Sequence, residues 1–111
     1  MLESKIEEAL RLGVEAVGGL CEKHVSPGKV GVPDRLITWP WGNYCLPYGA
    51  MELVELKKPG EKVKPNSPQD RDHKRRYVRG VKVTVLSTPE QVYNFLLTRK
   101  NYAVRRGWIN S

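Results

Sequence analysis

The two clearest helix starts in this chain stand on either side of a strand, and this order limits the folds available to it. Residues 67–70 (Ser-Pro-Gln-Asp) and 88–91 (Thr-Pro-Glu-Gln) each begin with a hydroxyl cap, followed by a proline at the first helical position and an acidic residue in the first turn. Between them, residues 81–86 (VKVTVL) alternate in the way that is typical of a strand. This part of the chain therefore predicts a helix, a strand and a helix in succession.

The N-terminal half predicts one more helix and three strands. Apolar side chains recur at helical spacing through residues 4–18, and Ser4 with Glu7 three positions later forms a capping-box pattern. Strand-like runs follow at residues 20–25, 34–39 and 51–58. The order helix, three strands, helix, strand, helix predicts an α/β fold in which helices flank a small mixed β-sheet.

Length and charge narrow the class of protein. At 111 residues the chain has the usual size of a single domain, and its 19 Lys and Arg residues outnumber 12 Asp and Glu to give a net charge of +7. Such an excess of positive charge favours a polyanionic partner such as nucleic acid. No apolar run approaches the roughly 20 residues needed to cross a bilayer, and the first residues lack the pattern of a secretory signal. We therefore expect a cytoplasmic protein with no membrane partner.

The two cysteines, Cys21 and Cys45, lack the spacing of a metal motif and are expected to be free, buried thiols. A zinc site formed by Cys21, His24, Cys45 and His73 is an alternative that no ligand spacing supports.

Two carboxylates and a lysine are the strongest candidates for chemistry. The side-chain period of two in a strand puts Glu55 and Lys57 on one face of the 51–58 strand, and Glu52 on the other. If the strand that begins at Asp34 lies beside it, both carboxylates and the ammonium group meet at one place. Two carboxylates can hold a hard divalent cation, and a nearby lysine can stabilise a developing negative charge. This set suits metal-assisted hydrolysis of a phosphodiester.

Three segments in a fixed order carry a family resemblance: residues 31–35 (GVPDR), 54–60 (VELKKPG) and 67–69 (SPQ). Together they resemble the virus-type replication-repair nuclease domain, VRR-NUC, a branch of the PD-(D/E)xK or restriction-endonuclease-like superfamily. Lys23 and residues 25–28 also resemble the short, stand-alone, phage-type members. The resemblance implies a restriction-endonuclease-like nuclease domain over residues 1–98. Residues 99–111 are basic and aromatic and are expected to form a C-terminal tail of this single domain.

The resemblance also implies a role for each matching residue. Asp34 and Glu55 would bind Mg²⁺ or Mn²⁺ together with the backbone carbonyl of Leu56. Lys57 would position the attacking water or stabilise the transition state. Gln69, in the first turn of its helix, would support the site.

Further residues are expected around this centre. Glu7 matches an acidic residue that often faces such sites, and its neighbour Glu8 stays open as the alternative. Trp39, Trp41 and Tyr44 either stack on unpaired bases or belong to the core or a dimer surface. The basic residues expected to contact the DNA backbone are Lys23, Lys58, Arg71, Lys74, Arg75 and Arg76.

The function that these expectations predict is a metal-dependent endonuclease acting on branched DNA or four-way (Holliday) junctions in a bacterial or phage-infected host cell. Because one chain contains one candidate site, coordinated cutting of two strands calls for a homodimer. The alternatives are a non-catalytic DNA-binding protein that keeps the nuclease fold, and a nuclease that nicks DNA or trims flaps as a monomer.

Overall fold

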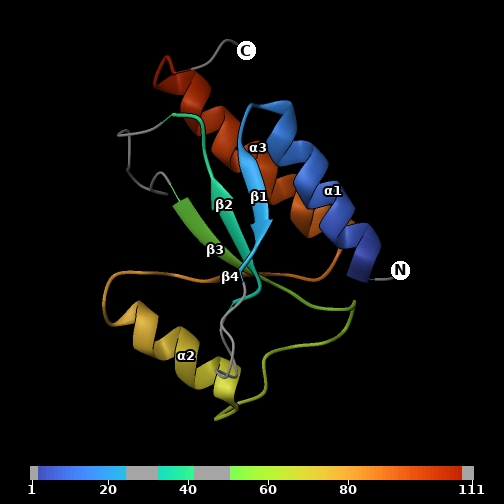
Figure 1. Ribbon diagram of the computed structural model, residues 1–111, viewed down its shortest axis with the longest axis vertical. Helices are drawn as coiled ribbons and strands as arrows, with labels where there is room; N and C mark the ends of the chain where they lie inside the picture. The colour runs from blue at the N-terminus through green and yellow to red at the C-terminus, as the bar shows by residue number, and fades with distance from the viewer. Residues whose placement is uncertain (1–2, 25–32, 42–50, 109–111) are drawn as a thin grey trace.

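The computed structural model describes residues 3–24, 33–41 and 51–108, and its element order is the predicted one (Figure 1). The helices are α1 (Glu3–Ala16), α2 (Pro68–Tyr77) and α3 (Pro89–Arg105). The strands are β1 (Leu20–Lys23), β2 (Arg35–Thr38), β3 (Met51–Leu56) and β4 (Thr84–Leu86). The predicted α/β class with a small mixed sheet is confirmed.

The four strands lie in the order β1-β2-β3-β4. β1 pairs with β2 and β2 with β3 in antiparallel orientation, whereas β3 and β4 are parallel. In the β2–β3 register Arg35 lies opposite Val54, so the next pair along the two strands is Asp34 and Glu55. Residues directly opposite each other in an antiparallel pair project to the same face of the sheet. The register therefore puts the two predicted carboxylates side by side.

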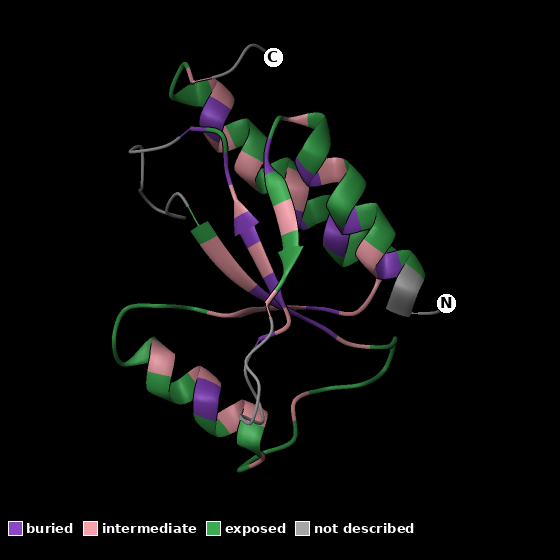
Figure 2. Ribbon diagram, in the orientation of Figure 1, coloured by how far each residue is buried: buried purple, intermediate pink, exposed green. Residues whose placement is uncertain are grey.

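α1 and α3 lie together over one face of the sheet, and α2 stands apart beyond its other side (Figure 1). The fully buried aliphatic residues belong to the α1, α3 and sheet layers: Ile6, Leu10, Val14, Ile37, Val54, Leu56 and Val92. Each such side chain contributes about 1.5–3 kcal/mol of burial free energy. Figure 2 shows several buried positions in the strands and along α1, whereas the buried residue of α2 is the charged Asp72. No helix in the described part of the chain is long and apolar enough to span a membrane.

The predicted caps of α2 and α3 are present. The Ser67 hydroxyl accepts a hydrogen bond from Asp70 N at 3.2 Å, and the Thr88 hydroxyl accepts one from Gln91 N at 3.1 Å. Each cap satisfies an amide in the first turn that has no partner within the helix. The cap signals thus place the starts of both helices correctly.

Two boundaries differ from the sequence expectations. α1 already includes Ser4, which is therefore not its cap. α3 continues past residue 98 to Arg105, Ala103 is buried, and Trp108 packs against the core. Residues 99–108 thus belong to the folded body rather than to a separate tail, because aromatic packing holds the end of the helix in place.

For Trp39 and Trp41, the structure selects the core from the alternatives that the sequence left open. Trp39 and Trp41 are 3% and 6% exposed and stack on each other with ring centroids 4.9 Å apart. Trp39 Nε1 donates to Glu52 at 2.6 Å, and the Arg99 guanidinium donates to the same carboxylate at 2.7 and 3.1 Å. Glu52 is therefore part of a buried structural network, which agrees with its exclusion from the site. Tyr44 lies outside the described residues.

Candidate active site

Asp34 and Glu55 meet where β2 begins and β3 ends. Asp34 Oδ1 accepts a hydrogen bond from Leu56 N at 3.2 Å, which ties this carboxylate to the strand that carries Glu55. His24 N donates to Asp34 O at 2.9 Å, so the backbone of Asp34 is held from the β1 side as well. The Glu55 side chain is 4% exposed and that of Asp34 31%. One carboxylate is thus enclosed, while its neighbour is open to solvent.

Gln69, in the first turn of α2, joins Glu55 to Lys57. Lys57 Nζ donates to Gln69 Oε1 at 2.5 Å, and Gln69 Nε2 donates to Glu55 Oε2 at 3.4 Å. One amide can reach both side chains only if they project to the same face of β3, as the strand period predicts. The structure therefore brings Asp34, Glu55, Lys57 and Gln69 together.

His73 is a residue at this site to which the sequence analysis gave no catalytic or DNA-binding role. Its Nε2 atom is buried and lies 4.0 Å from Glu55 Oε1, which is too long for a hydrogen bond. Burial of the ring lowers the pKa of His73, although the carboxylates of Asp72 and Asp70 act in the opposite direction. The ring is therefore neutral near pH 7. The signal that could have found His73 is its spacing of four residues from Gln69, which places both on one side of α2.

Arg35 is the second residue without an expected role. Its side chain is 8% exposed and bonds Glu7 Oε2 at 2.7 Å, while its NH1 donates to Asp34 O at 2.9 Å and lies 3.8 Å from Asp34 Oδ1. Glu7 of α1 thus reaches the site through the guanidinium beside Asp34, whereas Glu8 is exposed. Arg35 is two residues from the buried Ile37 and therefore lies on the same face of β2. This spacing could have indicated that the charge of Arg35 is buried and needs a partner.

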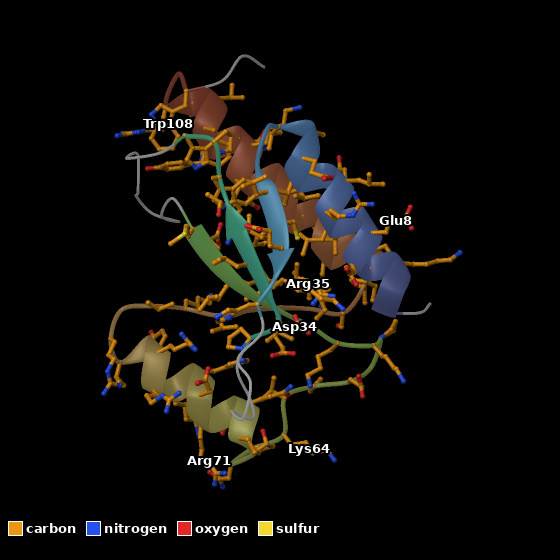
Figure 3. All side chains as sticks on the ribbon, viewed as in Figure 1. Glu8, Asp34, Arg35, Lys64, Arg71 and Trp108 are labelled. Carbon is orange, nitrogen blue, oxygen red and sulfur yellow. The ribbon has the colours of Figure 1, made fainter. Side chains whose placement is uncertain are left out.

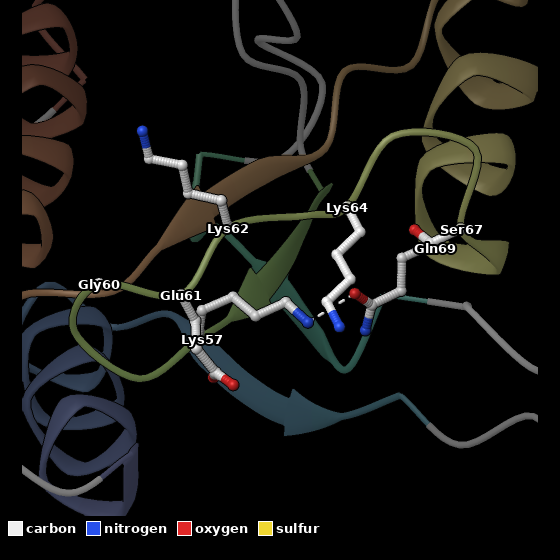
Figure 4. A pocket seen from close by; sticks show the side chains of 7 residues that line it. All are labelled: Lys57, Gly60, Glu61, Lys62, Lys64, Ser67 and Gln69. Atoms are coloured by element: carbon white, nitrogen blue, oxygen red, sulfur yellow. Dashed lines mark hydrogen bonds between the residues drawn. The ribbon is translucent and has the colours of Figure 1, made fainter.

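An open groove of about 540 Å³ begins at Lys57 and Gln69 (Figure 4). Its other lining residues are Gly60, Glu61, Lys62, Lys64 and Ser67. In Figure 4 the ammonium groups of Lys57 and Lys64 point toward Gln69. Three lysines and one glutamate give the groove a positive excess, which suits an anionic polymer.

Comparison with known proteins found relatives by sequence and by structure, although no family model matches the chain. The chain is 42% identical over 88 residues to "Putative nuclease p44" of Acyrthosiphon pisum secondary endosymbiont phage 1, which covers 79% of this chain and 85% of the relative. A solved structure described as "VRR_NUC domain" superposes with a TM-score of 0.66 at 33% identity, over 85% of this chain and 92% of that one. The chain belongs to the VRR-NUC family.

The donor set of this VRR-NUC domain fits a hard divalent cation. In an extended strand the N–H and C=O of one residue point to the same side, so the carbonyl of Leu56 faces the side on which its amide meets Asp34. Asp34, Glu55 and this carbonyl would supply oxygen ligands only. Mg²⁺ commonly takes one or two carboxylates and fills its remaining positions with water. Within the described residues no three His, Cys, Asp or Glu side chains cluster as a metal site, so this donor set relies on the backbone.

The basic residues expected to contact DNA fall into two groups in the VRR-NUC domain, and Arg71, which belongs to the first group, is labelled in Figure 3. Lys23, Lys58 and Arg71 are exposed. The others are held by acidic neighbours on α2: Lys74 by Asp70 at 3.0 Å, and Arg75 and Arg76 by Asp72 at 2.5 and 2.7 Å. Arg76 is half-buried and paired with Asp72, so its charge is less available to a DNA phosphate than that of an exposed residue.

Asp72 is the buried charge of α2. Burial by itself raises the pKa of Asp72, but the hydrogen bonds and charges of Arg76 and Arg75 outweigh it and bring the pKa below its usual range. Cys21 is a free, partly buried thiol whose pKa is raised by burial, and Cys45 lies outside the described residues.

Proposed function

We propose that this VRR-NUC nuclease is an Mg²⁺- or Mn²⁺-dependent endonuclease that cleaves branched DNA, including four-way junctions, as a homodimer. The single observation that carries the proposal is the chain of contacts from Lys57 through Gln69 to Glu55, with Asp34 bonded to the same strand. A cation, two carboxylates and a fixed lysine are the parts that phosphodiester hydrolysis needs.

Each residue of the centre has one task in this proposal. Asp34, Glu55 and the carbonyl of Leu56 would hold the cation. When bound, the cation would neutralise charge on the phosphate and lower the pKa of a coordinated water. The Lys57 ammonium would stabilise the negative charge that develops on the phosphate oxygens. Gln69 would fix Lys57 and Glu55 at one separation, since its amide engages both.

The burial of the Glu55 side chain supports this assignment of roles. This side chain lies beneath α2, where Gln69 and His73 exclude most of the solvent, and a carboxylate in such surroundings gains from a bound cation. The partly exposed carboxylate of Asp34 is the one that solvent and substrate can reach.

Cleavage of labelled four-way junctions in Mg²⁺, Mn²⁺ or EDTA tests the metal dependence. We expect cleavage with either cation and none in EDTA. Glu55→Gln should abolish cleavage while DNA binding in EDTA persists, and Glu90→Gln, which changes an exposed glutamate of α3, should behave like the wild type. Binding without cleavage under every condition would instead support a non-catalytic DNA-binding protein.

Lys57→Gln separates charge stabilisation from metal binding. We expect a fall of about 10²-fold or more in the rate at saturating Mg²⁺, with a smaller change in the Mg²⁺ concentration needed for half-maximal rate. Lys100→Gln is the matched control, because Lys100 is exposed on α3. Equal effects of the two substitutions would remove Lys57 from the chemistry.

Two experiments test the oligomeric state and the preferred DNA structure. Sedimentation velocity should give twice the mass of the 12.6 kDa chain, and a panel of single-stranded, duplex, flap and four-way DNAs should rank the four-way junction first. A monomer that prefers flaps would select the third alternative, a nicking or trimming nuclease.

A further inference from the structure

The C-terminal end of α2 carries an exposed apolar cluster. The exposed fractions of Tyr77, Val78 and Val81 are 68%, 76% and 42%. Gly80, at φ 86°, turns the chain here: Gly80 N donates to Tyr77 O at 3.0 Å and Val81 N donates to Arg76 O at 2.9 Å. These are the two bonds of a Schellman motif, so the exposed cluster has a defined shape.

Positive charge surrounds this cluster. No acidic residue occurs from His73 to Pro89, whereas the same stretch contains five basic residues: Lys74, Arg75, Arg76, Arg79 and Lys82. Arg75 and Arg76 compensate Asp72, and Lys74 pairs with Asp70. Arg79 and Lys82 are exposed. We call the surface formed by Lys74, Tyr77, Val78, Arg79, Val81 and Lys82 the α2 tip.

The α2 tip is connected to the active site by a row of side chains. Gln69, His73 and Tyr77 are spaced by four residues and follow one side of the helix. Gln69 contacts Glu55 and Lys57, while Tyr77 is eight residues farther on, or about 12 Å along the helix axis. That length matches about three or four stacked nucleotides at roughly 3.4 Å each. A DNA strand with a phosphate at Lys57 can therefore reach Tyr77 within about three or four nucleotides.

We propose that the α2 tip binds an unpaired nucleotide of the DNA substrate, with the Tyr77 ring stacked on the base and Arg79 and Lys82 on the flanking phosphates. The inference rests on the proposed function, because it takes DNA as the substrate. Exposed aromatic rings among basic residues are the usual means of holding unpaired bases, since every base offers a flat face. A second copy of this chain is the less suitable occupant, because two tips would bring like charges together.

Tyr77→Ala with Tyr93→Ala as its control tests the stacking. Tyr93 lies on α3, is 64% exposed, and so offers a ring of similar exposure on a different element. Binding of the full chain to fluorescent DNA is measured in EDTA, with a fork that has unpaired arms and a blunt duplex of equal length. We expect Tyr77→Ala to weaken fork binding by about tenfold and duplex binding by less than twofold, with Tyr77→Phe restoring most of the loss. Tyr93→Ala should change neither.

Salt dependence separates the ring from the charges. Tyr77→Ala should leave the slope of log K against log salt unchanged, whereas Arg79→Gln with Lys82→Gln should lower its magnitude by about 1.5. Equal losses on fork and duplex, no loss for Tyr77→Ala, or an equal loss for Tyr93→Ala would each overturn the proposal. Conversion of a dimer to a monomer by Tyr77→Ala, with unchanged DNA binding, would assign the tip to a contact between copies.

The binding assay also distinguishes this inference from the proposed function. One outcome is that the wild-type protein cleaves no DNA with any cation, while Tyr77→Ala weakens fork binding. This outcome would support the proposal for the α2 tip and refute the nuclease chemistry. Metal-dependent cleavage with no contribution from Tyr77 would give the opposite result.

Discussion

Replacing Glu52 by glutamine tests the difference between the two glutamates of β3. Glu52 and Glu55 are three residues apart on opposite faces of the strand, and the proposed function assigns only Glu55 to the metal site. Glu52 accepts hydrogen bonds from Trp39 at 2.6 Å and from Arg99 at 2.7 and 3.1 Å. The side chains of Glu52 and Arg99 are 9% and 13% exposed, so water can replace little of this network.

The expected loss of stability in Glu52→Gln follows from the missing negative charge of the glutamine amide. The amide keeps one acceptor oxygen but has no charge, so the ion pair between Glu52 and the Arg99 guanidinium is lost. Removing one member of a buried ion pair typically costs about 3–5 kcal/mol. Because the amide still fills the site and accepts one bond, we expect a loss of about 3 kcal/mol in the free energy of unfolding. For a domain of this size that lowers Tm by about 10 °C.

Urea denaturation followed by tryptophan fluorescence measures this loss, since Trp39 is itself part of the network. A double-mutant cycle with Arg99→Gln should give a coupling energy of about 1 kcal/mol or more. Glu55→Gln is the matched substitution on the same strand and should abolish cleavage by the folded protein. A cost below about 1 kcal/mol for Glu52→Gln, or loss of cleavage by its folded fraction, would refute the assignment.

Three further predictions concern the framework around the site. Arg35→Met should lower the free energy of unfolding by about 2 kcal/mol. This is less than the usual cost of breaking a buried ion pair, because the Glu7 side chain is 35% exposed. In urea denaturation, the effects of Arg35→Met and Glu7→Gln on the free energy of unfolding should not be additive. The pKa of Asp72 is below its ordinary value of 3.8 in the folded protein, so its contribution to stability is present above about pH 4 and is lost as the pH falls through the folded pKa. The free energies of unfolding of wild type and Asp72→Asn should therefore differ at pH 7 and converge as the pH is lowered below 3.8, and a constant difference would contradict this role. Gly19→Ala should cost about 1–3 kcal/mol, since the added Cβ would lie 2.9 Å from Thr38 O and 2.7 Å from a Val14 methyl; an unchanged Tm would show that β1 can shift.

Local sequence signals were sufficient for the order of elements and for the face shared by Glu55 and Lys57. Hydroxyl caps and prolines mark where α2 and α3 begin, because these residues act within a single turn. A strand period of two places Glu55 and Lys57 on one face, since side-chain direction in a strand depends on the backbone alone. The approach of Asp34 to β3 needed one further condition, the pairing of β2 with β3, which the structure meets.

The partners of the other charged side chains depend on packing between distant segments. Glu52 and Arg99 are 47 residues apart, and nothing in either neighbourhood indicates that they meet. The end of α3 likewise follows from the burial of Ala103 and the packing of Trp108, not from a stop signal near residue 98.

The sequence by itself therefore determined the α/β order, the caps of α2 and α3 and the face shared by Glu55 and Lys57, since each depends on residues a few positions apart. Only the tertiary structure decided that Arg35 links Glu7 to Asp34, that His73 lies beside Glu55, and that Glu52 is structural. The physical reason is that a buried charge takes its partner from whichever element packs against it, and local periodicity carries no information about that element.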